Sequence, residues 1–360
     1  FTGYKPCTPG KNCLTDCDII EKVGKLILII NLDAMGDVLM TTAQLKPIKD
    51  KYPESTICWL TLKNAAPLLW YNQYIDRIYI WNFESIQILQ QMKFNVVFNA
   101  DKSTNACALM KSLSSDEKFG FTLNTNGAVV PVSGSTNYNY TLGLNDHLKF
   151  KVNKRTGQDI LAETFELPFA RDEYVLNLTE EELLFCRDYK KKNQIKESDV
   201  VVGFNTGCSE LYPNKKMTIE QHVYLIEKLS SIDGIKIILL GGPEDTERNN
   251  QIAEFVGDKA LLTPTTEGLR RGICYENIAD IVISGDSFGM HLAIGLKKYV
   301  IAWFGLSCWS EIDLYDSGIK LIPEGLECAP CWKKVCPFDL ECIKMIDLDR
   351  ILAEVSKYKQ

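Results

Sequence analysis

Four short stretches of the sequence combine glycine with carboxylate, hydroxyl or lysine side chains, a combination suited to binding an anionic ligand. The first contains Gly36 and Asp37. Gly36 permits close approach of a ligand to the backbone, and Asp37 places a carboxylate in the first turn of an expected helix. This carboxylate either faces a cleft or merely caps the helix, and both interpretations stay open. Because no Gly-x-Gly-x-x-Gly motif is present here, a dinucleotide site is not indicated.

The second stretch contains Thr206, Gly207 and Lys215 and follows an expected strand. Its backbone N–H groups could hold a diphosphate, and Lys215 or Lys216 could neutralise the charge. The alternative is an exposed turn with ordinary surface lysines.

In the third stretch, Glu244 and Glu247 follow a glycine pair at the end of an expected strand. A carboxylate in this position can bind ribose hydroxyls, or it can simply complement a helix dipole. The fourth stretch groups Asp286, Ser287, Met290 and His291 around an expected helix start, which suits an anion, although a lone histidine is more often structural.

The elements between these stretches predict where they lie. The apolar run at residues 25–31 is typical of a strand buried on both faces. Strand and helix patterns alternate to residue 113, residues 120–145 read as a loop region, and the alternation restarts at residue 200. We expect strands at 25–31, 56–62, 77–80, 95–99, 200–204, 235–240, 260–262, 281–284 and 300–303, and helices at 38–52, 65–71, 84–92, 103–113, 157–167, 180–192, 219–231, 246–256, 269–277, 290–296 and 348–358.

Such alternation predicts an α/β fold of two Rossmann-like domains with parallel sheets and a ligand cleft between them. The expected divisions are a cysteine-rich arm at 1–24, a first domain at 25–190, a second domain at 199–346 and a closing helix at 347–360.

Taken together and in this order, the four stretches resemble glycosyltransferase family 9, the heptosyltransferase-like enzymes. The resemblance rests on Met35-Gly36-Asp37-Val38-Leu39, Gly203 to Gly207 with Lys215, Gly241 to Glu244, and Asp286 to His291, and covers roughly residues 25–346. Two positions depart from the family pattern. Phe288-Gly289 follows Asp286-Ser287, and Met217-Thr218 follows the lysines.

The resemblance implies a GT-B fold and inverting sugar transfer from a nucleoside diphosphate sugar, usually ADP-heptose, with no cofactor needed for transfer. Asp37 matches the family's proposed general base, and Lys215 and Asp286 match its nucleotide contacts. The expected acceptor is a hydroxyl of a glycan, a lipid-linked core or a protein. The alternatives are a sugar-nucleotide epimerase and an inactive nucleotide-binding scaffold.

Thirteen cysteines are present, and many of them gather at the two ends of the chain. The tail cluster comprises Cys328, Cys331, Cys336 and Cys342, and the first cluster comprises Cys7, Cys13 and Cys17. Four thiolates at short spacing can close a tetrahedral zinc or iron site, whereas buried thiols or local disulfides are the alternatives. The first cluster could bind a second metal or pack beside the tail cluster.

The composition of the chain limits the kinds of binding partner that we expect. The net charge of -7 argues against nucleic acid as the main partner. With 46% hydrophobic and 24% charged residues, the chain has the composition of a globular enzyme. No signal peptide or membrane-length apolar run is visible, so we expect a cytoplasmic protein with possible peripheral contact to the inner membrane.

Overall fold

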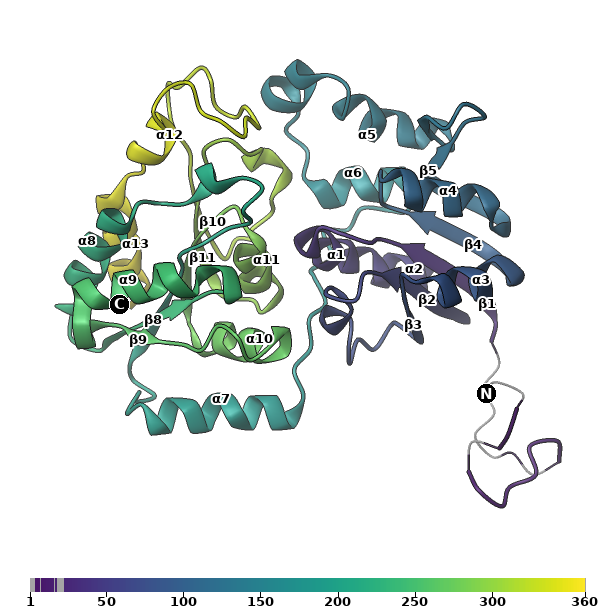
Figure 1. Ribbon diagram of the computed structural model, residues 1–360, viewed down its shortest axis with the longest axis horizontal. Helices are drawn as coiled ribbons and strands as arrows, with labels where there is room; N and C mark the ends of the chain where they lie inside the picture. The colour runs from purple at the N-terminus through teal and green to yellow at the C-terminus, as the bar shows by residue number, and fades with distance from the viewer. Residues whose placement is uncertain (1–3, 7, 16, 18–22, 360) are drawn as a thin grey trace.

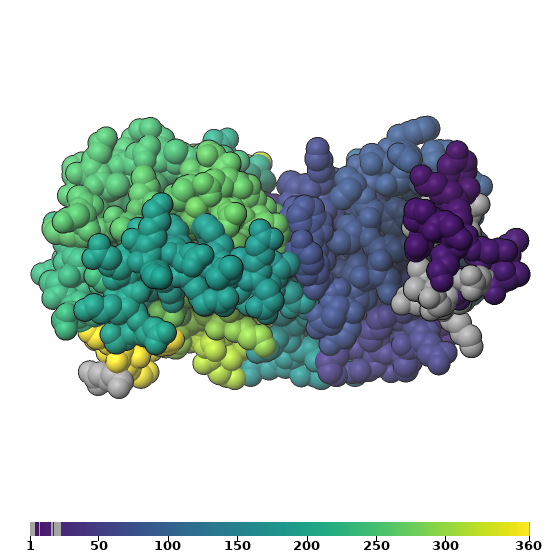
Figure 2. All heavy atoms as spheres, turned by 90° about the horizontal axis from the view of Figure 1, so that it is seen from below, coloured from purple at the N-terminus to yellow at the C-terminus, as the bar shows by residue number. Residues whose placement is uncertain are grey.

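Figure 1 shows the computed structural model, which describes residues 4–6, 8–15, 17 and 23–359. The chain forms two α/β domains, seen in Figure 2 as two lobes joined at a narrower waist. Cys7 lies outside the described residues. The described part of the first arm lies at the outer end of the first domain, far from helix α12 of the tail, so this part of the arm does not pack beside the tail cluster (Figures 1 and 2).

The first domain contains a six-stranded sheet in the order β3-β2-β1-β4-β5-β6. All pairs are parallel except β5 with β6. Its elements are β1 (Lys25–Ile30), α1 (Met35–Thr41), η1 (Thr42–Gln44), α2 (Leu45–Lys51), β2 (Ser55–Thr61), η2 (Ala66–Leu68), β3 (Arg77–Ile80), α3 (Phe83–Gln91), β4 (Lys93–Asn99), α4 (Thr104–Ser112), β5 (Ser114–Leu123), β6 (Val129–Pro131), η3 (Gly134–Thr136), α5 (Asn137–Leu142), η4 (Leu148–Val152) and α6 (Gly157–Thr164).

The second domain contains a six-stranded, fully parallel sheet in the order β12-β11-β10-β7-β8-β9. Its elements are α7 (Glu180–Lys192), β7 (Val200–Asn205), η5 (Pro213–Lys215), α8 (Ile219–Ser230), β8 (Ile235–Leu240), η6 (Pro243–Asp245), α9 (Thr246–Val256), η7 (Gly257–Lys259), β9 (Leu261–Leu262), α10 (Leu269–Ile278), β10 (Ile281–Gly285), α11 (Phe288–Gly295), β11 (Tyr299–Trp303), η8 (Trp309–Glu311), β12 (Gly318–Leu321), α12 (Glu341–Lys344) and α13 (Leu348–Lys359).

The expectation of two Rossmann-like domains is confirmed. In each sheet the chain starts at a central strand, moves outward to one edge, and returns to the other side of that strand. The strand order therefore reverses between β1 and β4 in one domain and between β7 and β10 in the other. Loops at the carboxyl ends of such strands diverge and leave room for a ligand.

Several local predictions were wrong. Residues 114–123 form strand β5 and 137–142 form helix α5, where a loop was expected over 120–145. The sequence signal for β5 is weak, because its first half carries charged, partly exposed side chains. The helix expected over 38–52 begins earlier, at Met35, and is interrupted at η1 before Pro47, which cannot donate a backbone hydrogen bond.

Two further elements differ from expectation. The helix expected over 65–71 is only the short turn η2, and strand β12 was not anticipated. Helix α7, within the range expected for the first domain, packs on α10 of the second through Phe185 and Tyr275, whose ring centroids are 5.5 Å apart. Helix α13 buries Ile351 and Val355 in the core of the second domain.

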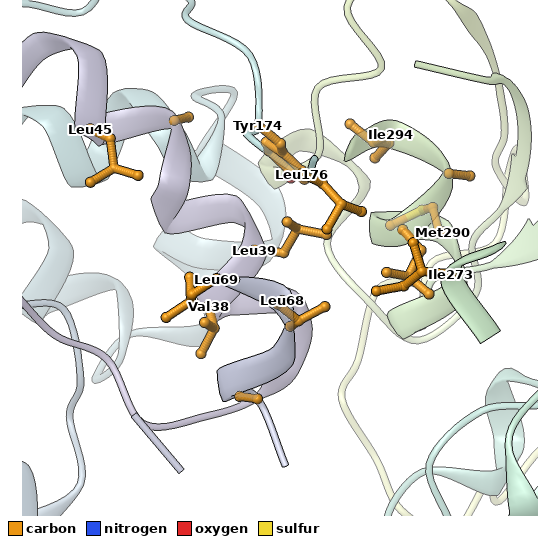
Figure 3. Packing of buried hydrophobic residues seen from close by; sticks show 14 of the residues in the cluster. Val38, Leu39, Leu45, Leu68, Leu69, Tyr174, Leu176, Ile273, Met290 and Ile294 are labelled. Carbon is orange, nitrogen blue, oxygen red and sulfur yellow. The ribbon is translucent and has the colours of Figure 1, made fainter. Parts of the chain in front are cut away.

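One hydrophobic cluster crosses the junction between the domains. It includes Leu39 of α1, Met290 and Ile294 of α11, and Leu176 of the connecting segment (Figure 3). Burial of apolar side chains at roughly 25 cal/mol per Å² stabilises this arrangement of the two domains. No helix among the described residues is long and apolar enough to cross a membrane.

Candidate active site

Polar residues from both sheets, some of them singled out in the sequence, gather where the two domains meet. Asp37 follows β1 and Lys102 follows β4, the two strands at the switch point of the first sheet. Asn205 ends β7 and Asp286 follows β10, the corresponding strands of the second sheet. Open α/β sheets bind ligands at this edge, so each domain contributes one wall of a single candidate site.

Gly36 allows the two walls of the site to lie close together. A Cβ at this position would lie 2.6 Å from Cδ2 and 3.1 Å from Nε2 of His291 on α11. A side chain would therefore push the helices apart. Gly36 was predicted to admit a ligand, but the structure gives it a contact between α1 and α11.

Asp37 stands at the third position of α1 and accepts a hydrogen bond from the Ala34 N–H, at 3.3 Å. Its carboxylate thus does cap the helix, but it is also accessible to solvent within the cleft. Burial between the two walls raises the pKa of Asp37, although His291 and the Ala34 N–H act in the opposite direction. A carboxylate with a raised pKa facing a cleft is suited to accept a proton.

Lys215 and Asp286 form an ion pair in the opposite wall. Lys215 Nζ lies 2.8 Å from Asp286 Oδ2, and the two side chains are only 14% and 12% exposed. Burial alone would raise the pKa of Asp286, but Lys215 and His291 outweigh it and hold the pKa below its usual value. The carboxylate therefore fixes the ammonium at the start of α11, where Ser287 caps the helix with its backbone.

Three residues of the cleft were missed by sequence reasoning. Lys149 of η4 pairs with Glu311 of η8 across the domains, with Nζ and Oε1 3.7 Å apart. Lys102 lies near both, and burial together with Lys149 lowers its pKa to about 8. No local motif marks these residues, because each comes from a different loop. The two lysines add positive charge to the first wall, opposite Lys215.

Trp332 connects the cysteine-rich tail to this site. The Nζ atoms of Lys215 and Lys149 lie 4.7 Å and 5.6 Å from its ring centroid, and Tyr212 packs edge-on against it at 5.0 Å. Cation–π contacts of this kind contribute about 0.5–1 kcal/mol at exposed sites and more when buried. The tail therefore forms part of the cleft rather than a separate module, which the sequence did not indicate.

The four tail cysteines surround a cavity of about 20 Å³, which Cys328, Cys331, Cys336 and Cys342 line together. Burial and the other thiols raise the pKa of Cys342 to about 11. Within residues 4–6, 8–15, 17 and 23–359, however, no three His, Cys, Asp or Glu side chains are positioned to hold a metal ion. As arranged, the thiols do not fit the predicted zinc or iron, and every cysteine of these ranges is a free thiol.

Two predicted contacts of the second stretch are engaged within the protein. The Thr206 hydroxyl is fully buried and donates to Asn249 Oδ1. A Cβ at Gly207 would overlap the Asp245 carboxylate, at 1.5 Å from Oδ1. Asp245, which sequence reasoning passed over, accepts from the Gly242 N–H at 2.9 Å, while its Oδ1 is buried without a hydrogen-bond partner among the described residues. Asp245 thus supports this loop from behind.

The remaining residues that were predicted to contact the ligand lie partly on the surface and partly in the interior. Glu244 is exposed beyond the carboxyl end of β8, so its carboxylate is free to meet a ligand. Glu247 is exposed one turn later and accepts from Gln251 Nε2 at 3.0 Å. Met290 is fully buried in the interdomain core, which makes it a packing residue, whereas His291 borders the cleft.

The unusual Phe288-Gly289 pair has a structural reason. A Cβ at Gly289 would lie 2.4 Å from Cγ of Asn205. Asn205 cannot move aside easily, because its Nδ2 donates to the buried Glu276 at 2.7 Å. Glycine at position 289 therefore lets α11 start directly above the end of β7.

Glu276 makes stability depend on pH. Burial raises its pKa to about 8, although Asn205 and Lys298 oppose the shift. A carboxyl with a raised pKa in the folded state contributes stability below its unfolded value of roughly 4.3, and this contribution is lost as the pH rises toward 8. Glu276→Gln keeps the acceptor for Asn205 without a charge. We expect it to gain about 1–3 kcal/mol over wild type between pH 5 and pH 8, by denaturant unfolding.

Glu267→Gln is the matched control. Glu267 is half-exposed and accepts from the Tyr275 hydroxyl at 2.7 Å, close to the same helix. The free energy of unfolding of Glu267→Gln should differ from that of wild type by the same amount at every pH between 5 and 8. If the free energy of unfolding of Glu276→Gln also differs from that of wild type by a constant amount over this range, position 276 does not hold a buried carboxyl that titrates there.

Two Rossmann-like domains that face each other across a ligand cleft define the GT-B class of glycosyltransferase fold. A family model described as Glycosyltransferase family 9 (heptosyltransferase) matches residues 83–341, well over half of the chain. The chain belongs to this family and is a glycosyltransferase. The epimerase and inactive-scaffold alternatives are therefore set aside.

Known relatives agree with this assignment. Lipopolysaccharide heptosyltransferase 1 of Campylobacter coli is 24% identical over 306 residues, covering 78% of this chain and 83% of the relative. A family 9 glycosyl transferase from Veillonella parvula superposes with a TM-score of 0.73 at 16% identity, covering 94% and 98% of the two chains. The ADP-heptose lps heptosyltransferase II of E. coli gives 0.66 at 16% identity, covering 92% and 98%.

Proposed function

We propose that this enzyme transfers heptose from ADP-heptose to a hydroxyl of the lipopolysaccharide core, with inversion at the anomeric carbon. The observation that carries the proposal is the opposition of Asp37 on one wall to the Lys215–Asp286 pair on the other. A base and an anion-binding cation on facing walls suit a displacement between an acceptor hydroxyl and a diphosphate. The names of the relatives from Campylobacter coli and E. coli support heptose as the sugar.

The proposed reaction is a single displacement. The acceptor oxygen attacks the anomeric carbon from the face opposite the diphosphate, while Asp37 takes the hydroxyl proton. The new glycosidic bond forms as the bond from the anomeric carbon to the diphosphate oxygen breaks, and ADP leaves with that electron pair. Lys215 and the first N–H groups of α11 stabilise the charge on the leaving diphosphate. No step uses a metal or cofactor.

Each residue has a defined part in this scheme. Asp37 supplies base assistance, worth about 10²–10⁴ in rate for positioned groups. The exposed Glu244 is proposed to meet the ribose hydroxyls of the donor, and Lys102 and Lys149 line the side from which the acceptor enters. Holding both substrates in one cleft adds the further advantage of proximity.

The expected place of action follows from the acceptor. Because the relative is named for lipopolysaccharide, we propose that the enzyme works at the cytoplasmic face of the inner membrane as a peripheral protein.

The donor and acceptor are tested in two steps. In a thermal-shift panel of nucleoside diphosphate sugars, ADP-heptose at 100 times its Kd is expected to add about 2.7 kcal/mol of stability. Transfer is then measured by mass spectrometry with truncated lipopolysaccharide, free glycan and protein acceptors, and NMR gives the anomeric configuration. Stabilisation and transfer with a UDP- or GDP-sugar but not with ADP-heptose would overturn the donor assignment, and transfer only to protein would overturn the acceptor.

A further inference from the structure

The segment at residues 172–178 links the two domains and is anchored to both. On the side of the second domain, the Asp172 carbonyl accepts from the Tyr315 hydroxyl at 2.9 Å, and the Glu173 carboxylate pairs with Lys297. On the side of the first domain, the Val175 N–H donates to Thr42 Oγ1 at 2.8 Å, and the Val175 carbonyl accepts from Asn72 Nδ2 at 3.5 Å. Figure 3 shows Tyr174 and Leu176 of this segment lying between α1 and α11. Tyr174 therefore stands at the junction of the two domains.

Tyr174 meets His291 directly. Its side chain is only 3% exposed, its hydroxyl lies 3.3 Å from His291 Nδ1, and the two rings stack with centroids 6.1 Å apart and planes at 15°. The opposite edge of the imidazole, with Cδ2 and Nε2, faces Gly36 at the start of α1. The two ring nitrogens of His291 thus have different surroundings, Nδ1 beside the Tyr174 hydroxyl and Nε2 against the start of α1.

Two neutral rings allow two arrangements of this hydrogen bond, in which either the phenol donates to Nδ1 or an Nδ1–H donates to the phenol oxygen. Burial raises the pKa of Tyr174 well above its usual value, so the phenol keeps its proton. Burial lowers the pKa of His291, although Asp286 and Asp37 act against this, so the imidazole is neutral above the usual histidine range. A neutral phenol that donates to Nδ1 leaves the remaining imidazole proton on Nε2.

The groups around Nε2 explain why the tautomer matters. Asp37 of α1 and Asp286 of the β10–α11 loop both act electrostatically on the ring, with Lys215 of η5 beside them. In the Nε2–H tautomer the ring has a donor on the edge that lies against Gly36, which precedes Asp37 in the chain, and in the other tautomer it has a lone pair on that edge. A donor is the more favourable of the two near the carboxylates that act on this ring.

We propose that Tyr174 is a positioning residue that holds His291 in the Nε2–H tautomer when the two domains are arranged as seen here. The proposal deepens the transfer reaction proposed above and rests on it. Tyr174 lies on the segment that connects the two domains, and its hydroxyl is 3.3 Å from His291 Nδ1 at the place where α1 and α11 pack against each other.

Imidazole NMR gives a direct test in the full-length protein. The chain has only 3 histidines, so long-range ¹H–¹⁵N spectra resolve the tautomer of each ring. Wild type is expected to show His291 protonated on Nε2, and Tyr174→Phe to show a mixture. The same variant is expected to lower kcat about 10-fold, the scale for losing a group that orients a reactive side chain, with the KM for ADP-heptose within about 3-fold.

Tyr315→Phe is the matched control. Tyr315 donates to the Asp172 carbonyl at 2.9 Å on the same segment and packs edge-on against Tyr174 at 5.9 Å. The variant is expected to lose stability but to keep the His291 tautomer and kcat. If Tyr315→Phe changes the His291 tautomer and kcat as much as Tyr174→Phe does, general packing is responsible and the proposal is overturned.

Two other outcomes are decisive. An Nδ1–H tautomer of His291 in wild type would overturn the inference even if Tyr174→Phe failed to fold. Unchanged tautomer and kcat in a folded Tyr174→Phe protein would do the same. If wild type and variant differ in tautomer as expected but wild type transfers heptose to no acceptor, the proposed function fails while the role of Tyr174 in positioning His291 stands.

Discussion

Asp37→Asn is expected to lower kcat by about 10³-fold, within the range for removing a positioned general base. Asparagine can still accept the Ala34 N–H hydrogen bond, which spans 3.3 Å in the wild type, so the start of α1 should be preserved. Its amide cannot take a proton from the acceptor hydroxyl. ADP-heptose binding, measured by calorimetry, should stay within about 3-fold of wild type, because the anion-binding lysine lies on the other wall.

The pH profile provides a second readout of the same residue. Burial raises the pKa of Asp37, so its carboxylate form appears at higher pH than for an ordinary aspartate. Because the base must be deprotonated, kcat/KM of wild type should rise with pH through this raised pKa. The residual activity of Asp37→Asn should lack that acidic limb.

Asp33→Asn is the matched control, since Asp33 is an exposed carboxylate in the same loop. Its kcat is expected to stay within a few-fold of the wild-type value, in contrast to the large loss expected for Asp37→Asn. Near-normal turnover of Asp37→Asn, or an equal loss at Asp33, would show that the base lies elsewhere. An unfolded Asp37→Asn protein is not expected, because removing a carboxylate with a raised pKa should leave Tm at or above that of wild type.

Lys215→Ala is expected to weaken ADP-heptose binding by about 30–100-fold, which corresponds to roughly 2–3 kcal/mol for a lost charged hydrogen bond. Its ammonium is held by Asp286 at 2.8 Å and by the face of Trp332, so it is already oriented before a diphosphate binds. The loss should appear in both binding and kcat, because the charge on the diphosphate increases as it leaves.

Removing Lys215 alone also leaves Asp286 buried without its cation, which costs about 3–5 kcal/mol in comparable pairs. The double variant Lys215→Ala/Asp286→Asn separates the two effects. It should recover much of the lost Tm but not the affinity for ADP-heptose. Lys216→Ala, which removes the neighbouring lysine, should change affinity by only a few-fold. Full recovery of affinity in the double variant would exclude Lys215 as a diphosphate contact.

Much of the architecture could be predicted from the sequence because the buried strands carry long apolar runs. Strands β1, β7 and β10 are covered on both faces, so their sequences are almost purely apolar and easily recognised. Strand β5 escaped prediction because its exposed first half carries serine and charged residues. Helix boundaries shifted by a few residues, as at the starts of α1 and α11, where the N-cap residues Ala34 and Ser287 make no side-chain capping hydrogen bond.

Some residues of the candidate site could likewise be predicted from local sequence, and others could not. Asp37, Lys215, Asp286 and His291 were recognisable because each belongs to a short glycine-containing stretch that follows a strand. Lys102, Lys149 and Trp332 carry no such local signal, since they come from separate loops that meet only after both domains have folded. Met290 and Thr206 lie within motifs, but their side chains turn into the interior.

The sequence by itself determined the two parallel sheets and the residues at their switch points, because strand burial and the turns that follow are local properties. Only the tertiary structure decided which of those residues face one another. Gly36 was expected to admit a ligand, yet its lack of a side chain instead allows His291 to pack against α1. That contact depends on the relative placement of two domains, which a local pattern cannot encode, and it brings Asp37 opposite the Lys215–Asp286 pair.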